Sequence, residues 1–227
     1  MFYGAIHGPR GDAPNGCIWT RQFVTPLTWV RAFLKGSNGE LERRFTLDAY
    51  LNKGEHITVT TDASPWGLGA VLEIGGVITS YFADAVSEVD KKVLSLAADG
   101  SSKDQQALEA LVILVALREW APVWTDRRVQ ISVRSDNTAA LSMVCKMQPH
   151  SDQMGIIARE LALDIGQSSV APDECQHIAG IANTAADHLS RMYEPGRAKA
   201  LPSYLEKVPR HQCSPRLHSW WRSVPPR

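Results

Sequence analysis

Four carboxylates constrain this chain more than any other feature, because each lies in a local sequence that would bring it towards the others. Asp62 and Asp136 each close a run rich in β-branched residues, which is typical of a strand end. Glu109 lies near the start of an apolar helical stretch, and Asp187 lies in a later helical stretch. Carboxylates that converge from two strand ends and two helices predict a divalent-metal site, because Mg²⁺ selects hard oxygen ligands.

The composition indicates one sizeable domain with flanking segments. Of the 227 residues, 44% are hydrophobic and 21% are charged, which is ordinary for a globular protein in water. No stretch approaches the roughly 18 uninterrupted apolar residues of a membrane span. The N-terminus lacks a charged segment followed by an apolar one, so we expect no secretory signal and an intracellular location, nucleus or cytoplasm.

The cysteines give no sign of a metal site or of a disulfide framework. Cys17, Cys145, Cys175 and Cys213 are widely scattered, and none belongs to a Cys-x-x-Cys pair. A reducing compartment is therefore the expectation for this chain.

The segment 57–193 carries a regular succession of strand and helix patterns. Alternating β-branched residues predict a first strand, and Gly75-Gly76 joins two further strands in a hairpin. The expected order is β-β-β-α-β-α-α-β-α. Strands are expected at residues 57–62, 68–73, 77–82, 129–135 and 174–178, and helices after 102–105 and at 137–146, 153–165 and 183–191.

Three other segments are less regular. Residues 1–56 begin with a loop rich in Gly and Pro and hold one helical pattern, over residues 23–35. Residues 84–100 are expected to be an irregular insert. Residues 194–227 are rich in Pro and basic residues, which predicts a poorly ordered extension.

Four motifs, in a consistent order and on the expected element types, resemble those of the ribonuclease H family. They are Thr61-Asp62-Ala63-Ser64, Glu109 in its helix, Ser135-Asp136-Asn137, and the block from His177 to Arg191. The similarity covers about residues 57–193 and is greatest to the RNase H domains that follow reverse transcriptases in retroelements. It implies an α/β, RNase H-like fold, with a five-stranded mixed sheet in the order 3-2-1-4-5 and helices on both faces.

The resemblance also implies an activity, the metal-dependent hydrolysis of the RNA strand of RNA/DNA hybrids by an endonuclease. Two Mg²⁺ ions, with Mn²⁺ as a substitute, could neutralise charge on the phosphate and activate a water. Asp62 would bridge the two ions. Glu109 and Asp136 would complete the ligands of one ion, and Asp187 those of the other. Seen alone, each acid has a plainer role, as a turn former, a solvated helix residue or a first-turn helix acid.

Three further residues have two interpretations each. The resemblance implies that His177 is a mobile general acid or base near the leaving group, whereas a strand-end histidine can simply be held by hydrogen bonds. Asn137 and Asn183 would contact the nucleic acid, but both also stand where an N-cap is expected. Trp66, Trp120 and Trp124 are expected to pack in the core.

Charge is unevenly distributed although the formal net charge is zero. Residues 57–193 carry 10 basic and 17 acidic side chains, whereas residues 194–227 carry 7 basic and 2 acidic ones. Phosphate neutralisation supplies most hybrid affinity, so an acidic domain should bind hybrid weakly by itself. A reverse transcriptase polymerase domain of the same polyprotein would supply the grip, with residues 1–56 as a connection-like segment. The tail offers candidate phosphate contacts, namely Arg197, Lys199, Lys207, Arg210, Arg216, Arg222 and Arg227.

Two alternative functions remain open from the sequence. An integrase-type nuclease on the same fold also uses clustered acids, but with different spacing. A catalytically idle tether or binding module of a decayed retroelement would be expected to lose a carboxylate, and none of the four is lost.

Overall fold

The computed structural model describes residues 21–35, 54–97, 102–125, 129–167, 172, 174–197 and 200–224. Within the segment 1–56, helix α2 (Arg21–Leu34) confirms the helix predicted at residues 23–35. The remainder of that segment, and with it the prediction of a connection-like role, lies outside the described residues except for the start of the first strand. In the described part of the chain, no helix is both long and apolar enough to cross a membrane.

The centre of the fold is a five-stranded sheet in the order β3-β2-β1-β4-β5, which confirms the predicted order. β1 pairs antiparallel with β2, and β2 with β3, whereas β1, β4 and β5 run parallel. Gly75 and Gly76 make the β2–β3 turn with φ values of 59° and 81°, which only glycine adopts readily. The strands are β1 (Glu55–Ala63), β2 (Gly67–Ile74), β3 (Val77–Ala85), β4 (Val129–Ser135) and β5 (Glu174–His177).

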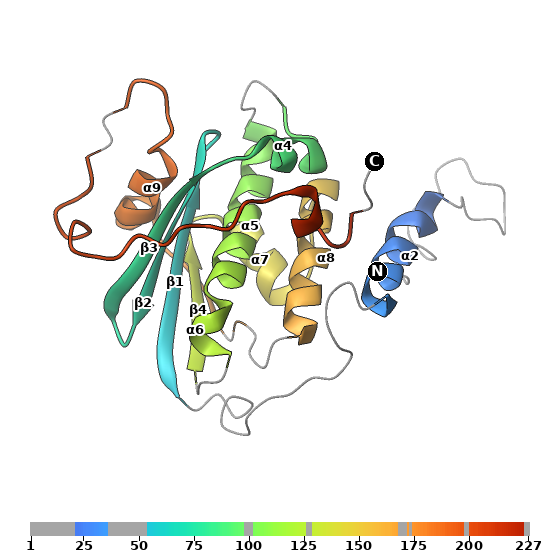
Figure 1. The fold of residues 1–227 in the computed structure, drawn as a ribbon, viewed down its shortest axis with the longest axis horizontal. Helices are drawn as coiled ribbons and strands as arrows, with labels where there is room; N and C mark the ends of the chain where they lie inside the picture. Colours follow the sequence, from blue (N-terminus) through green and yellow to red (C-terminus); the bar gives the residue numbers. More distant parts are fainter. Residues whose placement is uncertain are drawn as a thin grey trace.

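Helices cover both faces of the sheet, as predicted (Figure 1). The larger core lies between the sheet and α5, whose residues from Ala110 to Ala116 are all fully buried. Trp120 and Trp124 pack in this core, as predicted, whereas Trp66 is 37% exposed. The helices on this side are α5 (Ser102–Glu119), the short α6 (Ala121–Trp124), α7 (Thr138–Lys146) and α8 (Asp152–Gln167), and α9 (Thr184–Ser190) lies on the opposite face.

The segment 84–100 is more regular than predicted. It contains the helix α4 (Glu88–Leu94), which begins with a capping box between Ser87 and Asp90. The Ser87 hydroxyl accepts from the Asp90 amide, and the Asp90 carboxylate accepts from the Ser87 amide, each at 3.0 Å. This Ser-x-x-Asp motif uses Asp where Glu or Gln is usual, which is why the sequence pattern was missed.

The C-terminal strap, residues 200–224, corrects the prediction of a poorly ordered tail. It passes β3 and continues across α5 to α8 (Figure 1). Tyr81 of β3 forms an isolated parallel bridge with Arg210, and Leu205 and Trp221 are almost completely buried. The apolar residues of the strap therefore complete both cores of the domain.

Two arginines of the strap, Arg216 and Arg222, are neutralised by carboxylates of the acidic domain. Arg216 is buried and pairs with Asp84 and with Asp90, the latter at 2.8 Å. Arg222 bonds Asp164, and Ser223 donates twice at 2.6 Å to the fully buried Glu160. Opposite net charges of domain and tail thus drive an intramolecular contact, and these two arginines are not free for phosphate. Lys199 and Arg227 lie outside the described residues.

The structure pairs Cys145, near the end of α7, with Cys175 of β5 in a disulfide, with a Cα–Cα distance of 6.4 Å. No local pattern predicts this pair, because 30 residues separate the two cysteines and only the packing of α7 beside β5 brings them together. Among the described residues, Cys213 is a free thiol. Burial, followed by the nearby Asp84 and Glu119, raises the pKa of Cys213 to about 12.

Candidate metal centre

Three of the four predicted carboxylates meet at one end of the two central strands. Asp62 lies near the end of β1, and Asp136 directly follows β4, the parallel neighbour of β1. Glu109 reaches the same place from α5. One oxygen from each of the three side chains lies within 4.8 Å of the others, so they form a group that could hold a metal ion. We call it the three-acid cluster.

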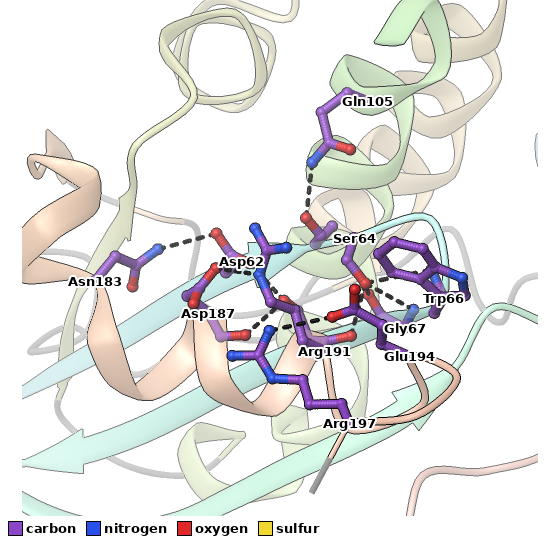
Figure 2. A network of polar contacts seen from close by, with 12 residues as sticks. Asp62, Ser64, Trp66, Gly67, Gln105, Asn183, Asp187, Arg191, Glu194 and Arg197 are labelled. Atoms are coloured by element: carbon purple, nitrogen blue, oxygen red, sulfur yellow. Dashed lines mark hydrogen bonds and ion pairs between the residues drawn. The ribbon is translucent and has the colours of Figure 1, made fainter. Parts of the chain in front are cut away.

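Glu109 is held so that one of its oxygens has no partner among the residues that the structure describes. Its Oε1 accepts from the Ala63 amide at 3.3 Å and from Gln105 Nε2 at 2.9 Å. Gln105 also donates to the Ala63 carbonyl at 2.7 Å, which ties α5 to the end of β1 (Figure 2). Glu109 is only 3% exposed, and its Oε2 is buried without a hydrogen bond. Such an orphaned buried oxygen is costly unless a donor or cation occupies the site.

Asp62 is oriented by contacts from α9, which lies on the face of the sheet opposite to α5. Ser190 Oγ donates to Asp62 Oδ2 at 2.6 Å, and Asn183 Nδ2 lies 3.5 Å from Oδ1. The Asp62 side chain is buried, at 6% exposure, but both oxygens have contacts. Figure 2 shows this network around Asp62.

A glycine lets α9 come this close to the sheet. Gly69 of β2 stands opposite Asp62 in the strand register. A Cβ at Gly69 would lie 2.4 Å from both the Ala186 carbonyl oxygen and the Ser190 nitrogen. A glycine inside a strand often marks such a close backbone approach. The placement of Ser190 against Asp62 therefore depends on the missing side chain at Gly69.

Burial and mutual repulsion favour the protonated forms of two cluster carboxyls. Burial, with the nearby Asp136 and Asp187, raises the pKa of Asp62 to about 6, although the Ser190 hydrogen bond opposes the shift. Burial, followed by the charge of Asp62, raises the pKa of Glu109 well above its ordinary value. Bound cations would offset both causes. The oxygen donor set and the orphaned Glu109 Oε2 therefore fit a hard divalent cation.

Asp187 stands beside the three-acid cluster but is not part of it. Its Oδ1 accepts from Arg191 Nε at 2.6 Å, one helical turn further along α9. It is near enough for its charge to contribute to the raised pKa of Asp62. The structure thus brings together three of the four acids predicted to share a cluster, and the fourth has an arginine as its partner.

The other predicted site residues lie around the cluster. His177 is exposed at the end of β5, and its Nε2 lies 3.1 Å from the Asp136 carbonyl oxygen. Asn137 caps α7 by accepting from the Ala140 amide at 3.0 Å. Asn183 is the N-cap residue of α9 without a side-chain capping bond; it is buried, and its amide donates to the Thr61 carbonyl at 2.9 Å. In this arrangement Asn183 ties α9 to β1.

Sequence reasoning assigned no individual role to four residues that shape the site, namely Ser64, Gln105, Ser190 and Arg191. Ser64 Oγ donates to the Ser190 carbonyl at 2.7 Å and accepts from the Gly67 amide at 3.1 Å. Helical spacing was the one available signal, because Gln105 and Arg191 stand four residues from Glu109 and Asp187. No local signal links Ser190 to Asp62, since 128 residues separate them.

Comparison with known proteins gave few matches. No protein-family model matches the chain, and no curated protein matches it significantly. Among solved structures it is similar to RNase H1 from the halophilic archaeon Halobacterium salinarum NRC-1. The identity is 18% and the TM-score 0.45, over 61% of this chain and 96% of the archaeal one. Fold and site together define an α/β domain with an acidic cluster suited to a divalent cation.

Proposed function

We propose that this chain is a metal-dependent endonuclease that hydrolyses the RNA strand of RNA/DNA hybrids. The observation that carries the proposal is the three-acid cluster of Asp62, Glu109 and Asp136, with its orphaned Glu109 oxygen. The choice of an RNA/DNA hybrid as substrate depends on the motif resemblance to the ribonuclease H family. The confirmed sheet order agrees with that choice.

The cluster residues have distinct roles in this proposal. Divalent cations, when bound, would supply the Lewis-acid chemistry for phosphodiester hydrolysis. Asp62, Glu109 and Asp136 would hold them, with Asp187 as a further ligand. Ser190 and Gln105 fix the carboxylates of Asp62 and Glu109, respectively, which limits reorganisation during the reaction.

His177 is the proposed general acid or base beside the cluster. It is exposed, and one ring nitrogen is near the backbone carbonyl of Asp136, so the ring stands at the edge of the site and open to solvent. A proton transfer group contributes about 10²–10⁴-fold to a rate. We therefore expect His177→Ala to slow turnover without abolishing it.

The proposal also includes a biological context, in which the chain is the RNase H part of a retroelement reverse transcriptase. The domain is acidic, and Arg216 and Arg222 of the strap are engaged with domain carboxylates, so these two cations are not free to grip a phosphate backbone. A polymerase domain of the same polyprotein would hold the hybrid instead. Adding such a partner should raise hybrid affinity and steepen its salt dependence, because each further phosphate contact releases counterions.

A cleavage assay on the full chain tests the proposal. End-labelled RNA/DNA hybrid, duplex DNA and single-stranded RNA are incubated with Mg²⁺, with Mn²⁺ or with EDTA. We expect cuts in the RNA strand of the hybrid alone, and only with a divalent cation. Cleavage of duplex DNA instead would favour the integrase-type alternative, and no cleavage of any substrate would favour the idle module.

Variants connect the activity to the cluster. Asp62→Asn and Glu109→Gln should each abolish hybrid cleavage while the far-UV circular dichroism stays unchanged. Glu88→Gln is a matched control, because Glu88 is an exposed acid at the start of α4 that pairs with Lys91 and is not a member of the three-acid cluster. Retained activity in Asp62→Asn would contradict a metal-dependent mechanism at this site.

A further inference from the structure

The Asp187 carboxylate has a partner that competes with any cation. Arg191 Nε donates to Asp187 Oδ1 at 2.6 Å, and both side chains are a little under two-fifths exposed. Asp187 also lies close enough to the cluster to influence Asp62 electrostatically. The two neighbouring contacts of α9 with Asp62, through Asn183 and Ser190, do not involve Asp187.

From this arrangement we infer that Arg191 is a positioning residue that withholds Asp187 from the three-acid cluster and so sets the affinity for a further cation. The inference rests on the proposed metal centre and adds a regulation to it. The three-acid cluster, whose orphaned Glu109 oxygen is already free, would load first. Asp187 would contribute only when its ion pair with Arg191 is broken.

The helix geometry makes the contact specific to this pair. Asn183 and Ser190 anchor the two ends of α9 to β1, through the Thr61 carbonyl and the Asp62 carboxylate. Because both ends of α9 are anchored, the backbone of Asp187 cannot move towards the cluster. Only the rotamer of the Asp187 side chain can change. Arg191 lies one turn away at i+4, which is the spacing at which helical side chains meet.

The strength of the pair sets the size of the expected effect. Exposed ion pairs contribute about 0.2–1 kcal/mol, so removing Arg191 should tighten binding of the further cation by up to about fivefold. Loss of the positive charge of Arg191 beside the site should also tighten cation binding, since like charges repel. Binding at the three-acid cluster should change less, because those carboxylates have no ion pair with Arg191.

The test counts bound ions without using catalysis. Metal-free full chain is titrated with Mn²⁺, and the unbound ion is measured by electron paramagnetic resonance. Arg191→Gln is compared with wild type and with Arg197→Gln, a matched control in which the exposed Arg197–Glu194 pair is removed. We expect wild type and Arg197→Gln to show one tighter and one weaker ion, and Arg191→Gln to bind the weaker ion more tightly.

A second variant ensures that the effect passes through Asp187. In an Asp187→Asn background, Arg191→Gln should no longer change the affinity, because the group it releases is gone. Identical isotherms for Arg191→Gln and Arg197→Gln would overturn the inference while leaving the metal centre intact. A wild-type chain that binds no Mn²⁺ would overturn both. Ion binding as expected, without hybrid cleavage, would refute only the proposed function.

Discussion

Ser190 donates a 2.6 Å hydrogen bond to Asp62, so the carboxylate of β1 is oriented by a helix on the far side of the sheet. The Ser190 hydroxyl is hydrogen-bonded to Oδ2 of Asp62, and Asn183 Nδ2 lies 3.5 Å from Oδ1 of the same carboxylate. Both donors come from the block that follows His177 in the sequence. This contact explains why the α9 segment matters to the site even though Asp187, its most obvious acid, is paired elsewhere.

Ser190→Ala should weaken divalent-cation binding by roughly tenfold, because a hydrogen bond to a charged group contributes about 1.5–3 kcal/mol and some of it is regained through solvent. Calorimetric titration with Mg²⁺ measures the change. Ser80→Ala is the control, since its hydroxyl makes a 3.4 Å contact with the Pro209 carbonyl on the exposed side of β3. Equal cation affinities in the two variants would show that Ser190 does not orient Asp62.

Asp62 should make the metal-free protein less stable as the pH rises. Its folded pKa of about 6 exceeds the ordinary 3.8, so the folded state holds more protons between these values. Stability therefore falls from about pH 4 to pH 6 and stays lower above it, by ~3 kcal/mol. Asp62→Asn removes this cost, and its free energy of urea unfolding in EDTA should exceed the wild-type value at pH 7.5 but not at pH 3.5.

Divalent cations should make the wild type more stable than Asp62→Asn at pH 7.5, which reverses the order expected in EDTA. Ligand binding to the folded state stabilises it in proportion to the logarithm of ligand concentration. Saturating Mg²⁺ at pH 7.5 should raise the melting temperature of the wild type and leave Asp62→Asn unchanged. An equal shift in both proteins would mean that the ion binds outside the three-acid cluster.

Gly69→Ala should displace α9 and lower both stability and activity. The new Cβ would meet two backbone atoms of α9 at 2.4 Å, and backbone cannot move aside as a flexible side chain does. Overpacking of this kind costs about 1–3 kcal/mol. Gly155→Ala on α8 is the matched control, because the nearest atom to its Cβ is a side-chain nitrogen at 3.6 Å. Chemical denaturation of both variants compares them directly.

Arg216→Met should destabilise the domain by about 3–5 kcal/mol, because it leaves the buried Asp90 without its cation. Arg197→Met removes an exposed pair and should cost less than about 1 kcal/mol. Urea unfolding measured by tryptophan fluorescence reports both, since Trp221 is buried in the same strap. A small effect of Arg216→Met would indicate that the strap adds little to folding.

Much of the fold could be predicted from the sequence, because the patterns that specify each strand and helix are local. The β-branched run to Asp62, the Gly75-Gly76 turn and the apolar helix around Glu109 each fix one element, and their order fixed the sheet. The helix α4 was not predicted, because the capping box that begins it has Asp90 at the position where Glu or Gln is usual. The strap was misread because composition alone describes its proline and arginine content, and not the carboxylates that face it.

Local patterns were enough to predict which acids could meet, since strand ends and helix positions are set by neighbours a few residues away. Long-range packing brings Asp62, Glu109 and Asp136 into one cluster, while Asp187 pairs with Arg191 one helical turn away. It also decided the pairing of Cys145 with Cys175 and of Arg216 with Asp90. Such contacts join residues far apart in the chain, so they depend on how packed elements approach one another in space, which no local pattern encodes.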